Sequence, residues 1–339
     1  MKLSNRIKAG AGGAGILGLA AALVVSPWAS ASSAATNFEG FSAGSPNGQS
    51  GWSATGAFDH KIVANTAASP YSYKTFGSKS LRISDSVTSG SFGDQTFAKP
   101  LTDAVGESDA AAGSYSSGTR QRHFVMQFDI ASARPNAVQP GLKVSVSPDR
   151  GDGARMSYLR FEDGPGGMNV FFDDVQGATG GSANFVESQI AANLNRSVPH
   201  NVKLTLDAID GPSNDVVRVW IDNQLRASGR SWEDYYVLDP ESQAGVGPHS
   251  RIVRTVLFRT SGTSVPAHAG AGYLFDNLTM SSGAIPPTKL GQCDAANWKT
   301  FADPAFSSAL DCILYVTNYR LATALPPISI RLHVSLHLL

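Results

Sequence analysis

The stretch NDVVRVWIDNQL, residues 214–225, contains residue types from which a sugar-binding site can be built. An aromatic ring packs on the apolar face of a sugar, and a guanidinium donates hydrogen bonds to oxygen atoms. Strand alternation directs Ile221 and two valines toward a core and leaves Arg218 and Trp220 on the opposite face. We therefore predict Arg218 and Trp220 as ligand-binding residues; packing of Trp220 under a covering loop is the alternative.

The same stretch holds two aspartates that could act in acid–base chemistry. Asp222 and Asn223 follow the strand, and both residue types tolerate the positive φ angles of a two-residue hairpin turn. Asp215 ends a polar loop, where short side chains bond nearby backbone amides. We therefore interpret both aspartates as architectural.

A second group, SWEDYY at residues 231–236, surrounds two acids with aromatic rings. Aromatic rings beside carboxylates can form the rim of a saccharide site, so we predict ligand-binding roles for Trp232, Tyr235 and Tyr236. The alternative is that these rings fold the loop down over the protein, with the acids merely solvated.

Such residues must be positioned by β-structure, because short apolar segments alternate with turn residues and no helical period is sustained. This pattern predicts an all-β protein, an antiparallel two-sheet jelly-roll sandwich. The predicted strands are 80–84, 123–130, 142–147, 155–161, 168–174, 202–209, 216–221, 253–260 and 272–280.

The ends of the chain differ from this central pattern. Basic residues, an apolar run and small residues at the N-terminus predict a signal peptide over residues 1–35, cleaved after Ala31 or Ala35. We expect a secreted protein with no membrane span once this peptide is removed. The two cysteines, Cys293 and Cys312, predict one disulfide in that oxidising environment. The predicted parts are the signal peptide, a sandwich over 36–282, a proline-containing linker over 283–291, a disulfide-stapled module over 292–318 and an atypical tail over 319–339.

Charge and metal-binding residues limit the partners. Lys and Arg total 27 and Asp and Glu also total 27, so the net charge does not favour nucleic acid or an anionic membrane.

The first and last strands of a jelly roll are often neighbours, which would bring Glu39 and Asp276 together. Since calcium prefers oxygen ligands, we predict a structural calcium ion there as the one candidate cofactor. The oligomeric state is left open.

Three segments carry a family resemblance: RGDGARMSYLRFEDGPGG, the long run from PHNVKL to EDYY, and YLFDNLTM. Over about residues 37–282 the chain resembles secreted bacterial proteins of the concanavalin A-like lectin and glucanase superfamily, with a hairpin similar to that of laminin-G-like sandwiches. The cysteine-containing segment that follows is similar to a short C-terminal segment of other secreted bacterial proteins. The resemblance implies a jelly roll and a polysaccharide or glycan partner.

The resemblance does not extend to known catalytic patterns. The E-x-D-x-x-E strand of sandwich glucanases is missing, although retaining hydrolysis needs two carboxyl groups about 5 Å apart, and the G-x-S-x-G elbow of serine hydrolases is missing too. If the protein degrades polysaccharide, its acids would come from separate strands and loops: Asp163, Asp173, Glu233 or Asp234. Four further features are expected to be structural or surface features: His60, His123, His200 and the Arg150-Gly151-Asp152 turn.

We therefore predict a secreted, non-catalytic protein that binds polysaccharide. The first alternative is a polysaccharide hydrolase or lyase on the same fold. The second is a structural or adhesive extracellular protein without a sugar site.

Overall fold

The computed structural model describes residues 32–65, 73, 75–103, 110–112, 115–117, 121–179, 182–209, 213–238, 253–260, 262–287, 289–293, 297–301 and 306–324. Most of the predicted signal peptide, up to residue 31, lies outside the described residues. The predicted tail lies outside them from residue 325 onward.

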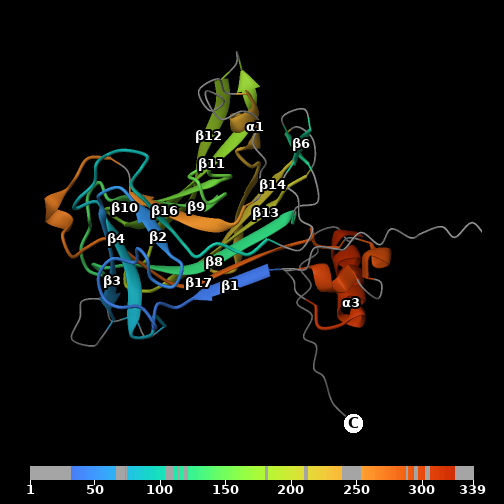
Figure 1. Ribbon diagram of the computed structural model, residues 1–339, viewed down its shortest axis with the longest axis horizontal. Helices are drawn as coiled ribbons and strands as arrows, with labels where there is room; N and C mark the ends of the chain where they lie inside the picture. The colour runs from blue at the N-terminus through green and yellow to red at the C-terminus, as the bar shows by residue number, and fades with distance from the viewer. Residues whose placement is uncertain are drawn as a thin grey trace, which may run out of the picture.

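Two antiparallel sheets form the body of the molecule (Figure 1). Sheet A has the strand order β15 (Gln224–Gly229), β14 (Val216–Ile221), β13 (His200–Asp207), β8 (His123–Ser132), β17 (Tyr273–Gly283), β4 (Lys79–Ser84) and β3 (Asp59–Ala64), and β1 (Ser32–Thr36) also pairs with β17. Sheet B has the order β12 (Ser182–Leu194), β11 (Gly167–Thr179), β10 (Tyr158–Gly164), β9 (Lys143–Asp149), β16 (Thr255–Thr260), β5 (Gln95–Phe97) and β2 (Ser53–Thr55). A two-stranded ribbon joins β6 (Ala110–Ala112) and β7 (Tyr115–Ser117). The predicted two-sheet sandwich is confirmed.

The core lies between the two sheets. Alternate apolar residues of β14 are fully buried, as strand alternation predicts, and β10 shows the same alternation, whereas every residue of β16 is buried. Phe128 of sheet A meets Phe161 and Phe258 of sheet B edge-on, with ring centroids 6.0 and 6.4 Å apart. Burial of this apolar surface leaves the outer face of each sheet for polar side chains.

The sandwich begins with β1, inside the segment assigned to the signal peptide. Ser32 to Thr36 pair with Ser282 to Leu278 of β17, so these first and last strands are neighbours. Cleavage after Ala31 leaves β1 whole, whereas cleavage after Ala35 leaves only Thr36 of it. The sequence also gave no prediction for β2, β3, β5, β6, β7, β12 and β15.

The helical elements among the described residues are α1 (Glu233–Leu238), α3 (Ala309–Ala324), and the 3-10 turns η1 (Pro266–His268), η2 (Leu290–Cys293) and η3 (Asn297–Thr300). The C-terminal module lies at one end of the sandwich (Figure 1). The predicted disulfide between Cys293 and Cys312 is confirmed, with their Cα atoms 5.5 Å apart. Phe301 and Val316 pack with it in a small separate core. Of the helices that the structure describes, none is long and apolar enough to cross a bilayer.

Both aspartates of the 214–225 stretch have architectural partners. Asp222 and Asn223 have φ angles of 51° and 62°, which is the hairpin turn that the sequence predicts. Asp215 accepts hydrogen bonds from the amide of Ile209 at 2.7 Å and from the hydroxyl of Ser231 at 2.5 Å. Asp215 therefore ties the start of β14 to the segment before α1.

Candidate functional site

Polar side chains cross the outer face of sheet B in rungs formed by strand register. In one rung, Arg259 of β16 lies opposite Gln95 of β5 and Ser145 of β9 in the strand register. Arg160 of β10 continues this rung, opposite Ser145 on one side and Phe171 of β11 on the other. Tyr158, Asp173 and Glu187 form the adjacent rung on β10, β11 and β12. Because alternate residues of these strands fill the core, the register gathers these side chains on one outer face.

An arginine–aromatic cluster lies at one end of these rungs; it consists of Phe92, Arg155, Tyr158, Trp232 and Arg259. The Cζ atoms of Arg155 and Arg259 lie 5.1 and 4.2 Å from the centroid of the Phe92 ring. Arg155 also lies 5.8 Å from the Trp232 ring, which stacks on Tyr158 at a centroid distance of 5.6 Å. The cluster thus combines two cations with three aromatic rings.

The ring of Phe92 is held over the guanidiniums by a short loop. Asp94 at the end of this loop is fully buried, and it accepts hydrogen bonds from the amide of Ser89 and from the hydroxyls of Thr88 and Ser89. These bonds outweigh burial and lower the pKa of Asp94. The loop is anchored at its base while Phe92 is 66% exposed, so solvent and ligands can reach the outer side of its ring.

Burial shapes the electrostatics of the arginine pair. Arg259 is 5% exposed; this burial, together with the like charge of Arg155, lowers its pKa, while a hydrogen bond with Tyr158 opposes the shift. The Nε atoms of both arginines are buried without a hydrogen-bond partner. Within the described part of the chain, neither guanidinium forms an ion pair with a carboxylate.

The other end of the face is acidic. Arg160 pairs with Glu162 at 2.8 Å and with Glu187 at 2.7 Å. Burial raises the pKa of Asp173 to about 6, assisted by the charges of Glu187 and Glu162 and opposed by Arg160. The hydrogen bond from Arg160 lowers the pKa of Glu187. Asp173 and Glu187 are directly opposed across β11 and β12, so two neighbouring carboxyl groups have pKa values shifted in opposite directions.

The predicted ligand-binding residues do not form a single site. Trp232, Tyr235 and Tyr236 contact one another at the sheet B edge, but Trp232 and Tyr236 are only 9% and 8% exposed. These two rings therefore pack α1 against the sandwich, whereas the neighbouring acids Glu233 and Asp234 are buried rather than solvated as the alternative expected. Trp220 and Arg218 lie on the outer face of sheet A instead. There, Lys203 lies over the Trp220 ring, and Arg218 pairs with Asp207 at 3.0 Å.

Sequence reasoning missed the exposed rings and the arginine pair. Phe92 and Phe185 are 66% and 45% exposed, and Phe185 meets Trp232 edge-on at 5.0 Å. Phe92, Arg155 and Arg259 come from a loop, the segment before β10 and the strand β16, which only the tertiary structure brings together. No local pattern in the sequence indicates that these three residues are neighbours.

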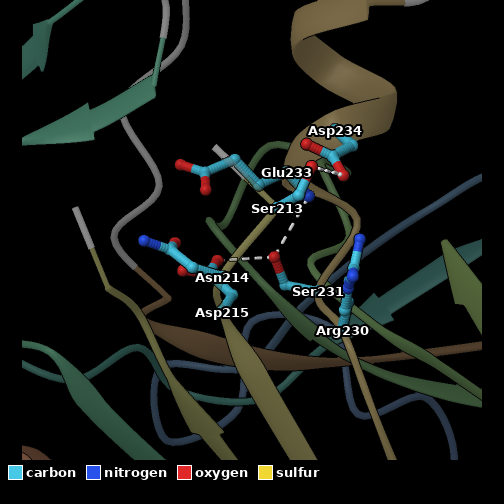
Figure 2. A pocket seen from close by; sticks show the side chains of 7 residues that line it. All are labelled: Ser213, Asn214, Asp215, Arg230, Ser231, Glu233 and Asp234. Carbon is cyan, nitrogen blue, oxygen red and sulfur yellow. Dashed lines mark hydrogen bonds between the residues drawn. The ribbon is translucent and has the colours of Figure 1, made fainter. Parts of the chain in front are cut away.

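Of the four predicted acids, Asp173 lies on the outer face of sheet B. Asp163 is buried and accepts hydrogen bonds from Arg196 and from the Gln139 amide, both at 2.6 Å, so it is a structural anchor. Glu233 and Asp234 line a small polar pocket (Figure 2).

That pocket is built from hydrogen bonds that fix the loop before α1. The hydroxyl of Ser213 donates to Asp234 at 2.6 Å, and the amide of Glu233 donates to Ser231 at 3.1 Å. Figure 2 shows these side chains with Asn214, Asp215 and Arg230 around the start of α1. Both acids are 2% exposed, which places them under the surface rather than on a saccharide-binding rim.

The three histidines and the RGD turn have structural partners. His60 bonds Thr96, His123 bonds Asp207 at 2.5 Å, and His200 bonds Asp222 at 2.7 Å. In the RGD turn, the Asp149 carboxylate accepts hydrogen bonds from the Gly151 and Gly153 amides, and Arg150 pairs with Asp152 at 3.2 Å. These contacts agree with the structural and turn roles that the sequence suggested.

The predicted calcium ligands lie near the end of the β1–β17 pair. Glu39 accepts hydrogen bonds from the amides of Ser78 and Lys79, and a Cβ on Gly77 would lie 2.1 Å from its Oε1 atom. Asp276 is 1% exposed, and its pKa is raised to about 7 by burial and by the charges of Glu39 and Asp129. The described residues contain no group of three or more His, Cys, Asp or Glu side chains arranged to hold a metal.

The two antiparallel sheets define the chain as a jelly-roll β-sandwich. No protein-family model and no curated protein match the sequence. Similar solved structures include an endo-β-1,4-glucuronan lyase from the fungus Trichoderma reesei, with a TM-score of 0.38 and 11% identity over 73% of this chain and 94% of that chain. A Bacillus licheniformis β-glucanase gives a TM-score of 0.34 and 13% identity over 74% of this chain and 97% of that chain.

A sialidase gives a TM-score of 0.38 and 12% identity over 75% of this chain, and only 18% of the sialidase is covered. Glucanase, lyase and sialidase structures are therefore what this sandwich is similar to. At these TM-scores and identities we transfer no ligand or activity from them.

Proposed function

We propose that the protein binds a polysaccharide on the outer face of sheet B, at the arginine–aromatic cluster. The observation that supports this proposal is the exposed Phe92 ring, held over two guanidiniums beside the stacked Trp232 and Tyr158. Sugar rings present apolar faces to aromatic rings and hydroxyl groups to polar side chains. We further propose that the protein acts outside the cell after removal of its signal peptide.

The proposal moves the binding site relative to the sequence prediction. Trp232 stays in it as a supporting ring, Phe92 is added as the exposed ring, and Trp220 with Arg218 is left on the opposite sheet. Phe92→Ala is the sharpest test because the side chain is 66% exposed, so its removal should leave the fold intact. Trp220→Ala is the matched control, since it removes an aromatic ring from the outer face of sheet A.

The experiment is a pull-down with insoluble polysaccharides, followed by titration of any soluble fragment that binds. We expect Phe92→Ala to weaken binding roughly three- to tenfold, the value of one stacked ring. Trp220→Ala should bind like the wild type. Loss of binding in Trp220→Ala alone would place the site on sheet A, and no binding by the wild type would favour the structural, non-binding alternative.

Polysaccharide degradation is a second candidate function, and the Asp173–Glu187 pair favours it. A carboxyl group with a pKa of about 6 can donate a proton near neutral pH, while its neighbour stays ionised. Reducing ends or unsaturated products from a glycan panel, lost in Asp173→Asn, would establish this function. Binding without such products would leave the protein a non-catalytic binder.

We also propose that a calcium ion binds between Glu39 and Asp276. The pairing of β1 with β17 brings these residues to the same end of the two strands, and their carboxylates are hard oxygen ligands. Backbone carbonyls and water would complete the coordination. A melting temperature that does not respond to calcium or to a chelator would refute this proposal.

A further inference from the structure

Two cations of the arginine–aromatic cluster are held together without a counter-charge. Arg155 and Arg259 share the ring of Phe92, and the charge of Arg155 acts directly on Arg259. Each has a buried Nε atom that lacks a hydrogen-bond partner, and the hydroxyl of Ser147 on the same sheet is buried without a partner as well. A desolvated cation is costly unless an anion or several acceptors offset it.

The nearest acids attract these two cations through space but form no ion pair with them among the described residues. Asp94 interacts with Arg259 over a distance, but its carboxylate is occupied by Thr88 and Ser89. Asp149 interacts with Arg155 in the same way, and its Oδ1 atom is occupied by two glycine amides of the following turn. Neither acid is within ion-pair distance of an arginine of the cluster among the described residues.

We propose that the cluster takes an acidic polysaccharide, whose carboxylate or sulfate groups bind Arg155 and Arg259. This inference rests on the proposed saccharide site and names the class of saccharide. A guanidinium binds carboxylate and sulfate oxygens through paired hydrogen bonds. The anion would supply the ion pair that the described residues do not form with these two arginines.

The flanking rings favour a saccharide over a small free anion. Arg155 lies between the rings of Phe92 and Trp232 and is partly exposed, so a sugar beside the edge of Phe92 would bring its acidic substituent to Arg155. A free phosphate or sulfate would use the guanidiniums but leave the exposed ring unused. Charge and ring together therefore select a sugar that bears an acidic group.

The opposite end of the face gives the bound chain a direction. Arg160 is already neutralised by Glu162 and Glu187, and Asp173 adds a further carboxyl group there. An acidic substituent would be repelled at that end and attracted at the cluster. We therefore expect the acidic sugar unit that contributes most to binding to lie over Arg155. The next sugar unit of the polysaccharide should present hydroxyl groups to the end of the face that contains Asp173.

The experiment compares polymers that differ only in charge. Wild-type protein is titrated against polygalacturonate and its methyl ester, and against dextran sulfate and dextran, by affinity electrophoresis and calorimetry. We expect binding to the charged member of at least one pair, at least tenfold tighter than to its neutral partner, and weaker as sodium chloride is raised. Comparison of the affinities for polygalacturonate and dextran sulfate then shows whether the site prefers a carboxylate or a sulfate group.

The variants are Arg155→Gln and Arg259→Gln, with Arg226→Gln as the matched control. Arg226 is exposed on β15 of sheet A, so this control removes one positive charge away from the cluster. We expect Arg155→Gln to weaken binding to the acidic polymer about ten- to a hundredfold, the value of a charge-assisted hydrogen bond, and Arg226→Gln to change it less than twofold. Because Arg259 is buried, binding by Arg259→Gln is interpreted only if this variant melts within a few degrees of the wild type. If Arg259→Gln is destabilised, Arg155→Gln alone provides the test, because Arg155 is partly exposed.

The outcomes separate this inference from the proposed function. Equal binding of charged and neutral polymers would overturn the inference and leave the saccharide site standing. An equal loss of affinity in Arg155→Gln and Arg226→Gln would also overturn it, because only net charge would then matter. If the protein bound none of these four polymers and nothing in the wider polysaccharide panel, the proposed function itself would be refuted. Binding only to neutral polysaccharides of that panel would overturn the inference alone.

Discussion

The substitution Asp276→Asn tests the electrostatics at the end of the β1–β17 pair. Asp276 is 1% exposed, its Oδ1 atom accepts one hydrogen bond from the Asn277 amide at 2.7 Å, and its pKa is raised from 3.8 to about 7. Burial is the largest cause, and the charges of Glu39 and Asp129 add to it. The folded protein therefore holds the Asp276 proton more tightly than the unfolded chain does.

The sign of the effect follows from this difference. Well below pH 3.8 the group is protonated in both states and contributes nothing to the pH dependence. As the pH rises from about 4 to about 7, the unfolded chain loses the proton first, so the free energy of unfolding falls. Each unit of pKa difference corresponds to 1.36 kcal/mol, so the loss is about 4 kcal/mol and is complete above pH 7. Asparagine keeps the shape and removes this loss.

We expect Asp276→Asn, in the presence of a chelator, to be more stable than the wild type by as much as about 4 kcal/mol at pH 8 and nearly equal to it at pH 4. For a sandwich of this size that is a rise of roughly 8–12 °C in melting temperature at pH 8. Circular dichroism melts of both proteins between pH 4 and pH 8 measure it. Asp103→Asn, which removes an exposed carboxylate, is the control and should show little difference at any pH.

Calcium adds a second arm to this experiment. If the ion binds at Glu39 and Asp276, it should raise the melting temperature of the wild type at pH 8 and leave Asp276→Asn unchanged. A variant that is less stable than the wild type at pH 8 in chelator would refute the reasoning, because the ionised carboxylate would then be stabilised without a metal.

Three further predictions follow from other parts of the molecule. Binding of an acidic polysaccharide should tighten as the pH falls through about 6, because Asp173 then loses its charge; titrations in Asp173→Asn should show a weaker pH dependence. The disulfide closes a loop with a sequence separation of 19 residues, worth roughly 3 kcal/mol, so Cys293→Ser with Cys312→Ser should unfold the C-terminal module before the sandwich, as seen by protease cleavage within α3. If the proposed signal peptide is removed, N-terminal sequencing of the mature protein should begin at Ser32, because cleavage after Ala31 preserves β1; a start at Thr36 would show that the sandwich does without this strand.

The sequence predicts those parts of the fold that local patterns encode. The alternation of β14 and the Asp222–Asn223 turn could both be recognised because β-branched residues and turn residues follow each other at fixed spacing. The strand β12 was missed because SANFVESQIAANL lacks a regular apolar alternation, and most of its described side chains are at least partly exposed. The strand β1 was missed because the same small residues also fit a signal-peptide cleavage site.

The candidate site could not be predicted because its residues are neighbours only through the tertiary structure. Arg259 lies on a strand, Phe92 on a loop and Arg155 in the segment before β10, and no sequence pattern links the three. Trp232 was identified from its aromatic context, but sequence could not show that its ring packs on Tyr158 rather than facing solvent. Asp173 was one of four acids named, and only its position opposite Tyr158 and Glu187 separates it from the structural Asp163.

The arginine pair is difficult to explain as a device for stability alone. An apolar side chain at position 259 would fill the same space beneath Phe92 without the cost of desolvating a cation, and buried ion pairs are commonly replaced by apolar residues without loss of stability. Arg259 forms no ion pair among the described residues. It donates a hydrogen bond to the Ser91 carbonyl at 3.4 Å and has a hydrogen bond with Tyr158, Asp94 attracts it through space, and the like charge of Arg155 lies beside it. The arrangement favours a ligand that brings its own negative charge, and this is the reason to test acidic polymers before neutral ones. If Arg259→Met proved more stable than the wild type yet lost affinity for an acidic polymer, stability and binding would be shown to oppose each other at this residue.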